Sequence, residues 1–271
     1  MEKQLDVNGL TLAVIDQGEG PAILFVHGLG GYKENWEENL GYFAAGHRAI
    51  AVDLPGFGRS EKPVDLPYGI EFFSDALCAA LDRLGVARAH WIGNSMGGHI
   101  AAFTALKHPA RVDRLVLVDA AGTNQAEIAE LIASNPAMAP NPDFSPTPEL
   151  IEMMMRNVIF FGPSPQIEKM IARAIEDLAR PDAPLRQQAT FKALQSIIAT
   201  PLAEQLGGIS SPTLLVWGRE DRLVTLAHGE SFAAKIANAK LHVIDQCGHC
   251  PMLEKPEEFN RVVGEFLGCA S

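Results

Sequence analysis

The sequence has little cysteine, fewer basic than acidic residues, and no long apolar stretch. Four cysteines in 271 residues do not form the dense framework of a secreted disulfide-rich domain, so we expect a reducing, cytoplasmic location. Thirty-three acidic against 22 basic residues give a net charge of −11, which disfavours nucleic acid and anionic membranes as partners. No apolar run reaches the roughly 18 residues of a membrane span, and Met1–Asp6 lacks the apolar core of a signal peptide.

What the sequence does have is a regular alternation of strand-like and helix-like segments. Helical spacing relates Phe73, Leu77 and Leu81 before a stop at Gly85, and a last helix starts at Pro256. Alternating strands and helices predict an α/β fold with a doubly wound, mostly parallel sheet. The strand-like segments are 11–15, 22–26, 49–52, 91–92, 115–118, 213–217 and 241–244.

This alternation stops between residues 122 and 207. Segment 135–148 contains five prolines and is expected to be irregular, and proline-initiated helices are predicted from about residues 148, 165 and 184. We therefore predict a core of residues 1–121 and 208–271. Residues 122–207 are predicted to form a helical cap over the strand ends.

The pentapeptide Gly93–Gly97 (Gly-Asn-Ser-Met-Gly) lies between a short apolar strand and a helix. It fits the G-x-S-x-G nucleophile elbow, in which a sharp turn raises a serine hydroxyl above a parallel sheet. The alternative is that Ser95 is an ordinary helix N-cap. The surrounding strand and helix favour Ser95 as a nucleophile.

A serine hydroxyl needs a base to take its proton, and a carboxylate to hold that base. His249 follows the strand-like segment 241–244 and is the best candidate for the base. Asp221 follows the segment 213–217 and is the best candidate for the acid. Asp119 also follows a strand and stays open as an alternative acid. The chain order Ser95, Asp221, His249 favours Asp221 but does not exclude Asp119.

Acyl transfer also needs N–H groups that stabilise an oxyanion. The N–H of Met96, directly after the nucleophile, is one expected donor. The N–H of Leu29, in the loop His27–Gly31, is the other. His27 and Asp53 are expected to brace the neighbouring loops and not to react.

With these motifs the chain resembles the α/β-hydrolase superfamily, of the cap-bearing serine esterase and lactonase type. The segments Asp53–Ser60 and His249–Pro256 resemble further motifs of that family. The resemblance implies a serine hydrolase that acts through an acyl-enzyme on Ser95 and needs neither metal nor organic cofactor. The partner it implies is a small-molecule ester; the oligomeric state is left open, with a homodimer as one possibility.

The elbow is also similar to that of the meta-cleavage-product hydrolases, which cut carbon–carbon bonds in dienol-diketo acids. Arg173 in the cap matches an arginine that this branch uses for substrate, and Met154 and Phe160 are candidate pocket residues. Two departures count against the branch: the His-Gly-Leu-Gly-Gly loop lacks a Gly-Pro-Gly pattern, and Cys250 stands where tryptophan is typical. We therefore expect a carboxylesterase acting on small to medium esters, with carbon–carbon hydrolysis or lactone hydrolysis as alternatives.

Cys247 and Cys250 flank His249 in a C-x-x-C pattern. Such a pattern is typical of redox dithiols, but those open a helix in a much shorter thioredoxin-like fold. A zinc site is disfavoured because no second pair of ligands has suitable spacing. The two thiols are expected to be bystanders.

Overall fold

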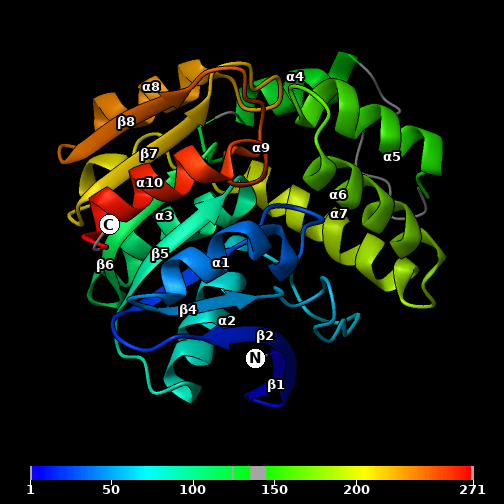
Figure 1. Ribbon diagram of the computed structural model, residues 1–271. Coiled ribbons are helices and arrows are strands. Elements are labelled where there is room, and N and C mark those ends of the chain that lie inside the picture. Colours follow the sequence, from blue (N-terminus) through cyan, green and yellow to red (C-terminus); the bar gives the residue numbers. More distant parts are fainter. Residues whose placement is uncertain (1, 124, 135–144, 270–271) are drawn as a thin grey trace.

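A computed structural model describes residues 2–123, 125–134 and 145–269, in which strands and helices alternate (Figure 1). The strands are β1 (Glu2–Val7), β2 (Leu10–Gln17), β3 (Ala22–Val26), β4 (Arg48–Val52), β5 (Ala89–Asn94), β6 (Val112–Val118), β7 (Thr213–Gly218) and β8 (Ala239–Ile244). The helices are α1 (Glu37–Ala44), α2 (Ile70–Arg83), α3 (Met96–Lys107), α4 (Gln125–Ser134), α5 (Pro148–Met154), α6 (Pro165–Glu176), α7 (Ala183–Ala199), α8 (Leu226–Lys235), α9 (Pro251–Glu254) and α10 (Pro256–Leu267). No helix in these ranges is both long and apolar enough to cross a membrane.

One sheet of eight strands, in the order β1-β2-β4-β3-β5-β6-β7-β8, organises the molecule. All pairs from β4 to β8 are parallel, whereas β2 pairs antiparallel with both β1 and β4. Asn8 and Gly9 join β1 to β2 with positive φ angles of 55° and 83°, as a tight hairpin turn requires. The prediction of a doubly wound, mostly parallel sheet is confirmed.

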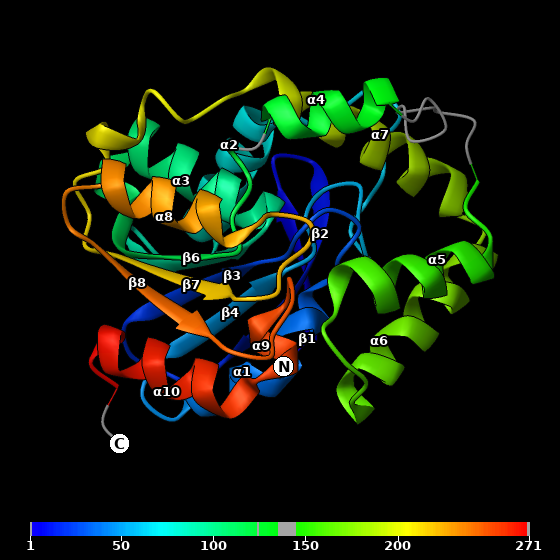
Figure 2. The same ribbon diagram turned by 90° about the horizontal axis from the view of Figure 1, so that it is seen from above.

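Helices cover both faces of the sheet, so its central strands are buried on both sides. Figure 2 shows α2, α3 and α8 on one face, and α1 and α10 on the other. Strand β3 supplies both cores, because its side chains alternate: Leu24 and Val26 pack toward α2 and α3, whereas Ile23 and Phe25 pack toward α1 and α10. The continuous apolar sequence of β3 is therefore explained by burial on two faces.

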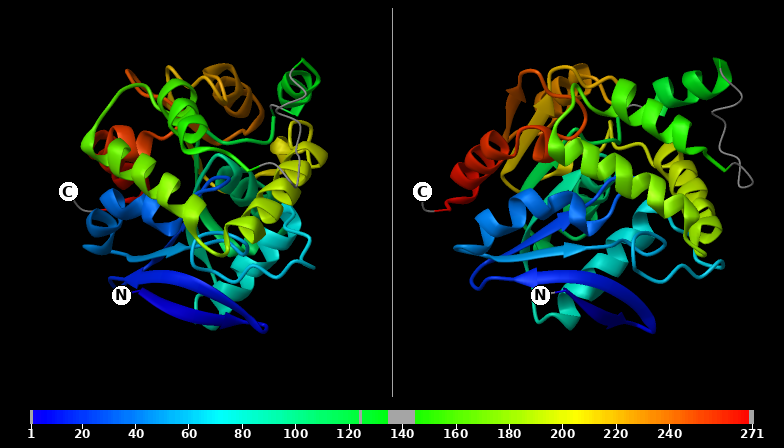
Figure 3. Two further views of the ribbon diagram at one scale, coloured as in Figure 1. Left: turned by 90° about the vertical axis from the view of Figure 1, so that its right-hand side faces the viewer. Right: turned by 45° about the vertical axis from the view of Figure 1, so that its right-hand side comes forward.

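Helices α4 to α7 follow β6, gather on one side of the molecule, and precede β7 (Figure 3). Helices α5, α6 and α7 begin at or beside the prolines that the sequence indicated. The chain leaves and re-enters the core at one place, where the N–H of Leu202 donates to the carbonyl of Gly122 at 2.8 Å. Residues 135–144 of the segment expected to be irregular lie outside the described residues, and the exact cap boundaries stay a prediction.

Candidate active site

Ser95 lies on a strained turn between β5 and α3. Its backbone angles are φ 55° and ψ −118°, in a region that costs a non-glycine residue about 1–3 kcal/mol. A Cβ on Gly93 would lie 2.2 Å from the carbonyl oxygen of Gly97, so the turn is too tight for a side chain there. The Ser95 side chain makes no capping hydrogen bond to α3, which argues against the alternative of an ordinary N-cap.

His249 and Asp221 form a buried pair beyond the ends of β8 and β7. The Nδ1 atom of His249 lies 2.7 Å from Oδ2 of Asp221, and each residue is 4% exposed. The other oxygen, Oδ1 of Asp221, accepts the N–H groups of Leu223 at 2.7 Å and Val224 at 3.0 Å. Burial alone would raise the pKa of Asp221, but the charge and hydrogen bond of His249 and these two N–H groups together lower it.

The elbow, the His249 loop and the loop after β3 converge at the carboxyl edge of the sheet. The side-chain amide of Asn94 donates to the carbonyl of His249 at 3.0 Å and to that of Val118 at 3.2 Å. A Cβ on Gly28 would lie 3.1 Å from Cβ of Ser95, so only a glycine lets this loop pass so close. The structure thus brings the segments of Ser95, Asp221, His249 and Leu29 to one edge.

The two N–H groups expected to stabilise an oxyanion belong to Leu29 and Met96. Within the described ranges, neither donates a hydrogen bond to another part of the chain. Met96 is fully buried, and Leu29 is half-buried against the core. Both N–H groups therefore remain available for a substrate oxygen.

His27 holds the loop after β3 in the manner expected of a brace. Its Nε2 accepts the N–H of Leu54 at 3.0 Å, so the proton is on Nδ1, which donates to the carbonyl of Gly28 at 2.7 Å. Burial lowers the pKa of this imidazole, which is fully enclosed and therefore neutral. His27 is engaged at both ring nitrogens.

Asp53 fixes the same loop from the end of β4. Its carboxylate accepts the N–H and Nζ of Lys33 at 2.7 and 3.0 Å, and the N–H of Arg59 at 2.9 Å. Lys33 is itself fully buried and reaches Glu34 at 2.9 Å. This ion-pair network ties the segment after the oxyanion loop to the loop that follows β4.

Asp119, the alternative acid, does not pair with His249. Its Oδ1 accepts the N–H of Gly218 at 2.9 Å, and its side chain is fully buried. One carboxylate oxygen or imidazole nitrogen from each of Asp119, Asp221 and His249 lies within 4.8 Å of the other two. In the described part of the chain, these three residues are the group close enough to hold a metal ion. The hydrogen bond between Asp221 and His249 already occupies one such atom of each.

Glu254 is a residue to which the sequence assigned no role. Its Oε1 accepts the N–H groups of Gly248 at 3.0 Å and Cys250 at 3.1 Å, on both sides of His249. Its Oε2 accepts the N–H of Phe161 from the cap at 2.8 Å. Burial raises the pKa of Glu254, although these three N–H groups oppose the rise. Its place five residues after His249, inside a recognised motif, was the available signal.

The cap residues expected at the pocket lie in different environments. Phe160 is buried in the segment whose carbonyl at Ile159 accepts the N–H of His249 at 2.8 Å. Met154 is half-buried at the end of α5. Arg173 on α6 is half-buried, and its Nη1 has no hydrogen-bond partner in the described part of the chain. Phe160 therefore directly follows the residue that bonds to the His249 loop.

The two thiols beside His249 are enclosed by apolar side chains. Cys247 and Cys250 are buried, free, and part of the core on the α10 side of the sheet. Burial raises the pKa of both thiols, so neither carries the thiolate that redox exchange requires. These surroundings support the bystander interpretation.

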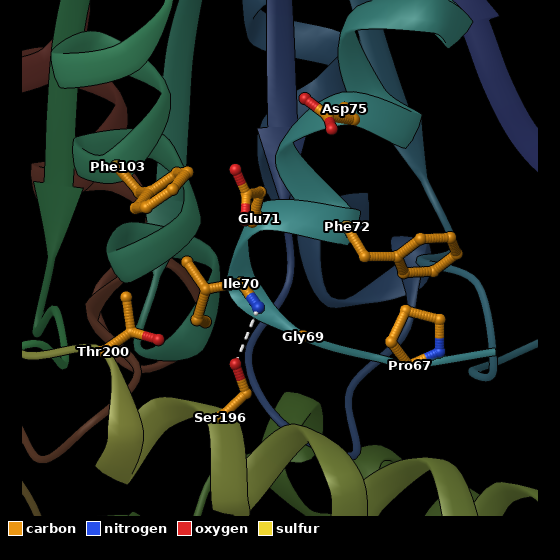
Figure 4. A pocket seen from close by; sticks show the side chains of 9 residues that line it. All are labelled: Pro67, Gly69, Ile70, Glu71, Phe72, Asp75, Phe103, Ser196 and Thr200. Atoms are coloured by element: carbon orange, nitrogen blue, oxygen red, sulfur yellow. Dashed lines mark hydrogen bonds between the residues drawn. The ribbon is translucent and has the colours of Figure 1, made fainter.

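A separate surface cavity of about 460 Å³ lies between α2, α3 and the end of α7. Figure 4 shows Ser196 of α7 accepting the N–H of Ile70 across it, with Phe72 and Phe103 beside them. Neither Ser95, Asp221 and His249 nor the two proposed oxyanion donors line it. It marks where the last cap helix meets the core and is distinct from the candidate active site.

The chain is similar over nearly its whole length to hydrolases of known specificity. It is 33% identical to a 2-hydroxy-6-oxononadienedioate/2-hydroxy-6-oxononatrienedioate hydrolase of Burkholderia vietnamiensis, covering 93% of this chain and 89% of that protein. It is 32% identical to the 2-hydroxy-6-oxo-6-phenylhexa-2,4-dienoate hydrolase of Comamonas testosteroni, covering 97% and 93%. The meta-cleavage product hydrolase of Pseudomonas fluorescens IP01 superimposes with a TM-score of 0.84 at 26% identity, covering 99% and 98%.

These relatives overturn the expectation of a carboxylesterase. They are dienoate hydrolases, so the alternative of carbon–carbon hydrolysis fits better than ester hydrolysis. The expectation was wrong because a triad of serine, histidine and aspartate can serve either bond, and two local departures were given too much weight. One of these, Cys250, has a buried side chain that packs in the core.

The family model described as alpha/beta hydrolase fold matches residues 21–256, from β3 to the start of α10. This range contains the elbow, both strand-end acids, His249 and the whole cap. The chain is a hydrolase that belongs to the alpha/beta hydrolase fold family.

Proposed function

We propose that the protein hydrolyses a carbon–carbon bond in a 2-hydroxy-6-oxo-dienoate. The observation that carries the proposal is the similarity to dienoate hydrolases over 93–97% of the chain, which includes the cap. Because proteins that share a fold and a triad act on different substrates, a similarity that also spans the cap bears on substrate class more than the elbow does.

The first step needs a carbon leaving group that can hold an electron pair. In the dienol form of such a substrate, the 2-hydroxyl proton moves to C5 and yields a 2,6-dioxo acid with a C3=C4 double bond. When the C5–C6 bond breaks, its electron pair moves from C5 through that double bond to the 2-oxo oxygen. The departing fragment is therefore a conjugated dienolate and not a bare carbanion.

Ser95 is proposed to attack the C6 carbonyl while His249 accepts its proton. Asp221 orients the imidazole and stabilises its charged form. The N–H groups of Leu29 and Met96 stabilise the oxyanion on C6. Collapse of this intermediate releases the dienolate, which takes the proton held by His249, and leaves an acyl-enzyme on Ser95. Water, activated by His249, then releases the carboxylic acid and restores the serine.

Arg173 is the proposed partner of the substrate carboxylate, with Met154 and Phe160 lining the pocket. The unpartnered Nη1 of Arg173 supports this role, since a buried guanidinium N–H without an acceptor is costly. Burial raises the pKa of Tyr32, and the charge of Arg173 is among the groups that oppose this rise. The pKa of Glu34 is lowered mainly by Lys33, with a smaller contribution from Arg173, so the charge of Arg173 lies near the segment after the oxyanion loop. A carboxylate and a distant 6-oxo group are two features that a dienoate offers together.

The test compares three substrates on wild type and Ser95→Ala. A 6-phenyl dienoate, a p-nitrophenyl ester and a γ-lactone are assayed under identical conditions, the first by loss of its dienolate absorbance. We expect the highest kcat/KM for the dienoate, with benzoate and a hydroxypentadienoate as products. Ser95→Ala is expected to abolish the formation of these products. The proposal is wrong if the dienoate is untouched while the ester or lactone turns over.

A further inference from the structure

Asp119 is held rigidly behind the pair of Asp221 and His249. It follows β6 directly, its N–H donates to the carbonyl of Val216 at 3.1 Å, and its Oδ1 accepts the N–H of Gly218 at 2.9 Å. Its φ of 43° lies in the left-handed region, which is uncommon for residues other than glycine. Two bonds to β7 thus fix both the backbone and the side chain.

The second carboxyl oxygen of Asp119 has no donor. Oδ2 is buried and makes no hydrogen bond within the described ranges, although ligand-type atoms of Asp119, Asp221 and His249 lie within 4.8 Å of one another. Two ionised carboxylates only accept hydrogen bonds, so they cannot satisfy each other. A single proton between them removes the unsatisfied atom and the repulsion together.

The hydrogen bonds decide which carboxyl carries that proton. Asp221 accepts three donors: Nδ1 of His249 and the N–H groups of Leu223 and Val224. Asp119 accepts one, from Gly218. Donors stabilise the charged form of a carboxyl group, so the ionised member is Asp221 and the neutral member is Asp119.

We propose that Asp119 is a protonated positioning residue, whose Oδ2–H donates to the Asp221 carboxylate and holds it for His249. The proposal rests on the proposed function only for its kinetic consequence. The proton itself is a property of the folded protein.

The surrounding charges agree with this assignment. Burial raises the pKa of Asp119 well above its usual range, the negative charge of Asp221 raises it further, and the Gly218 N–H only partly opposes the rise. The pKa of Asp221 moves in the opposite direction. Glu254 adds repulsion against a charge on Asp119, and the Cys247 and Cys250 thiols nearby stay uncharged. Two carboxyl groups whose pKa values are driven apart take different roles.

Infrared spectroscopy tests the proton without any substrate. Wild type at neutral pH is expected to show the C=O stretch of a protonated carboxylic acid, and Asp119→Asn is expected to lose it. Asp113→Asn, at the other end of β6, is the matched control and should keep the band. Glu254→Gln assigns any band of Glu254, whose pKa is also raised. If Asp119→Asn does not fold, a band that survives in Glu254→Gln and disappears at high pH still supports the proposal.

Kinetics then distinguish a proton donor from a charge. The amide of Asp119→Asn can donate as the acid does, so kcat is expected to stay within about threefold of wild type, whereas Asp119→Ala is expected to lose about tenfold. Because a neutral Asp119 contributes no charge, the acid limb of the kcat/KM profile should not move in Asp119→Asn. An ionised Asp119 would favour positive charge in the active site, and its loss would move that limb to lower pH.

Three results overturn the proposal: no acid band in wild type, a shifted acid limb in Asp119→Asn, or stoichiometric Zn²⁺ bound by wild type and lost in that variant. If the dienoate is not a substrate, the band is unaffected and the same profiles are measured on whichever substrate reacts. A result against the protonation of Asp119 can therefore be told apart from a result against dienoate hydrolysis.

Discussion

The carboxyl edge of the sheet and the cap are held together by different kinds of contact. At the edge, Asp221 accepts two backbone N–H groups and His27 is fixed at both ring nitrogens by backbone atoms. On the cap, Arg156 pairs with Glu168 at the surface, and Met153 is 47% exposed. Backbone bonds fix the orientation of a side chain, whereas exposed ion pairs contribute little to stability. Side chains at the carboxyl edge are therefore held in one orientation, whereas these exposed cap contacts restrain the cap side chains less.

One short segment of the cap contacts the His249 loop directly. The carbonyl of Ile159 accepts the N–H of His249, and the N–H of Phe161 donates to Glu254. A Cβ on Gly248 would lie 2.5 Å from the Ile159 carbonyl, so the two backbones are in direct contact. Through this contact the backbone of the proposed general base is bonded directly to the cap.

The largest expected effect comes from the edge. Asp221→Asn keeps the size of the side chain but removes the charge that holds His249, so kcat for the proposed dienoate is expected to fall by about 10⁴-fold. Asp113→Asn removes a carboxylate from the same sheet without touching His249 and should have no such effect. Stopped-flow absorbance gives both rates, and an unchanged rate in Asp221→Asn would mean that another group holds the imidazole.

The sequence predicted that these residues follow strands of one sheet, because strand ends are local signals. Ser95, Asp221 and His249 each follow an apolar strand, and parallel strands bring their carboxyl ends to one edge. The helices α1, α4 and α8 were not predicted, since none of them begins at or beside a proline that marks its start, as α5, α6 and α7 do. Neither was the contact of Asp119 with Gly218, because it joins residues 99 positions apart.

The second largest effect is expected in the cap. Arg173→Gln removes the proposed partner of the substrate carboxylate, and a charge-assisted hydrogen bond is worth about 1.5–3 kcal/mol. KM for the dienoate is therefore expected to rise roughly 10- to 100-fold, with kcat nearly unchanged. Lys169→Gln, one turn earlier on α6, removes an equal charge from a pair with Glu37 and is the control. Equal KM changes in both variants would exclude a specific role for Arg173.

The cap explains why the substrate class could not be read from the motifs. Esters, lactones and dienoates all present a carbonyl carbon to the same serine, so the edge is the same for each. What separates them is which side chains of Met154, Phe160 and Arg173 face the bound molecule. That depends on how α5 and α6 pack, which helical spacing alone does not determine.

A third prediction concerns stability and uses the raised pKa of Asp119. Asp119 stays protonated in the folded state but ionises in the unfolded state. The folded protein therefore loses stability as the pH rises above the ordinary pKa of 3.8 toward the raised pKa of the folded state. Wild type should therefore lose stability relative to Asp119→Asn by up to about 1.4 kcal/mol per pH unit in that window. Urea unfolding of both proteins at about pH 5, 6 and 7 measures the difference. A difference that is independent of pH would show that Asp119 ionises normally.

The smallest effect is expected where the edge and the cap meet. An amide at position 254 accepts through one oxygen only, so Glu254→Gln must leave either Phe161 or the pair Gly248 and Cys250 without an acceptor. One lost hydrogen bond to a charged group costs about 1.5 kcal/mol, so we expect kcat to fall about tenfold with little change in overall fold.

Glu257→Gln, exposed on α10, is the matched control and should behave as wild type. Hydrogen exchange at the Phe161 and Gly248 amides reports which contact has opened. If the amide keeps Gly248 and Cys250, only Phe161 is released, and KM should rise more than kcat falls because the cap is loosened. If it keeps Phe161, the His249 loop is released, and kcat should fall with KM unchanged. A variant in which neither amide exchanges faster would show that the two regions are joined by packing, and not by this carboxylate.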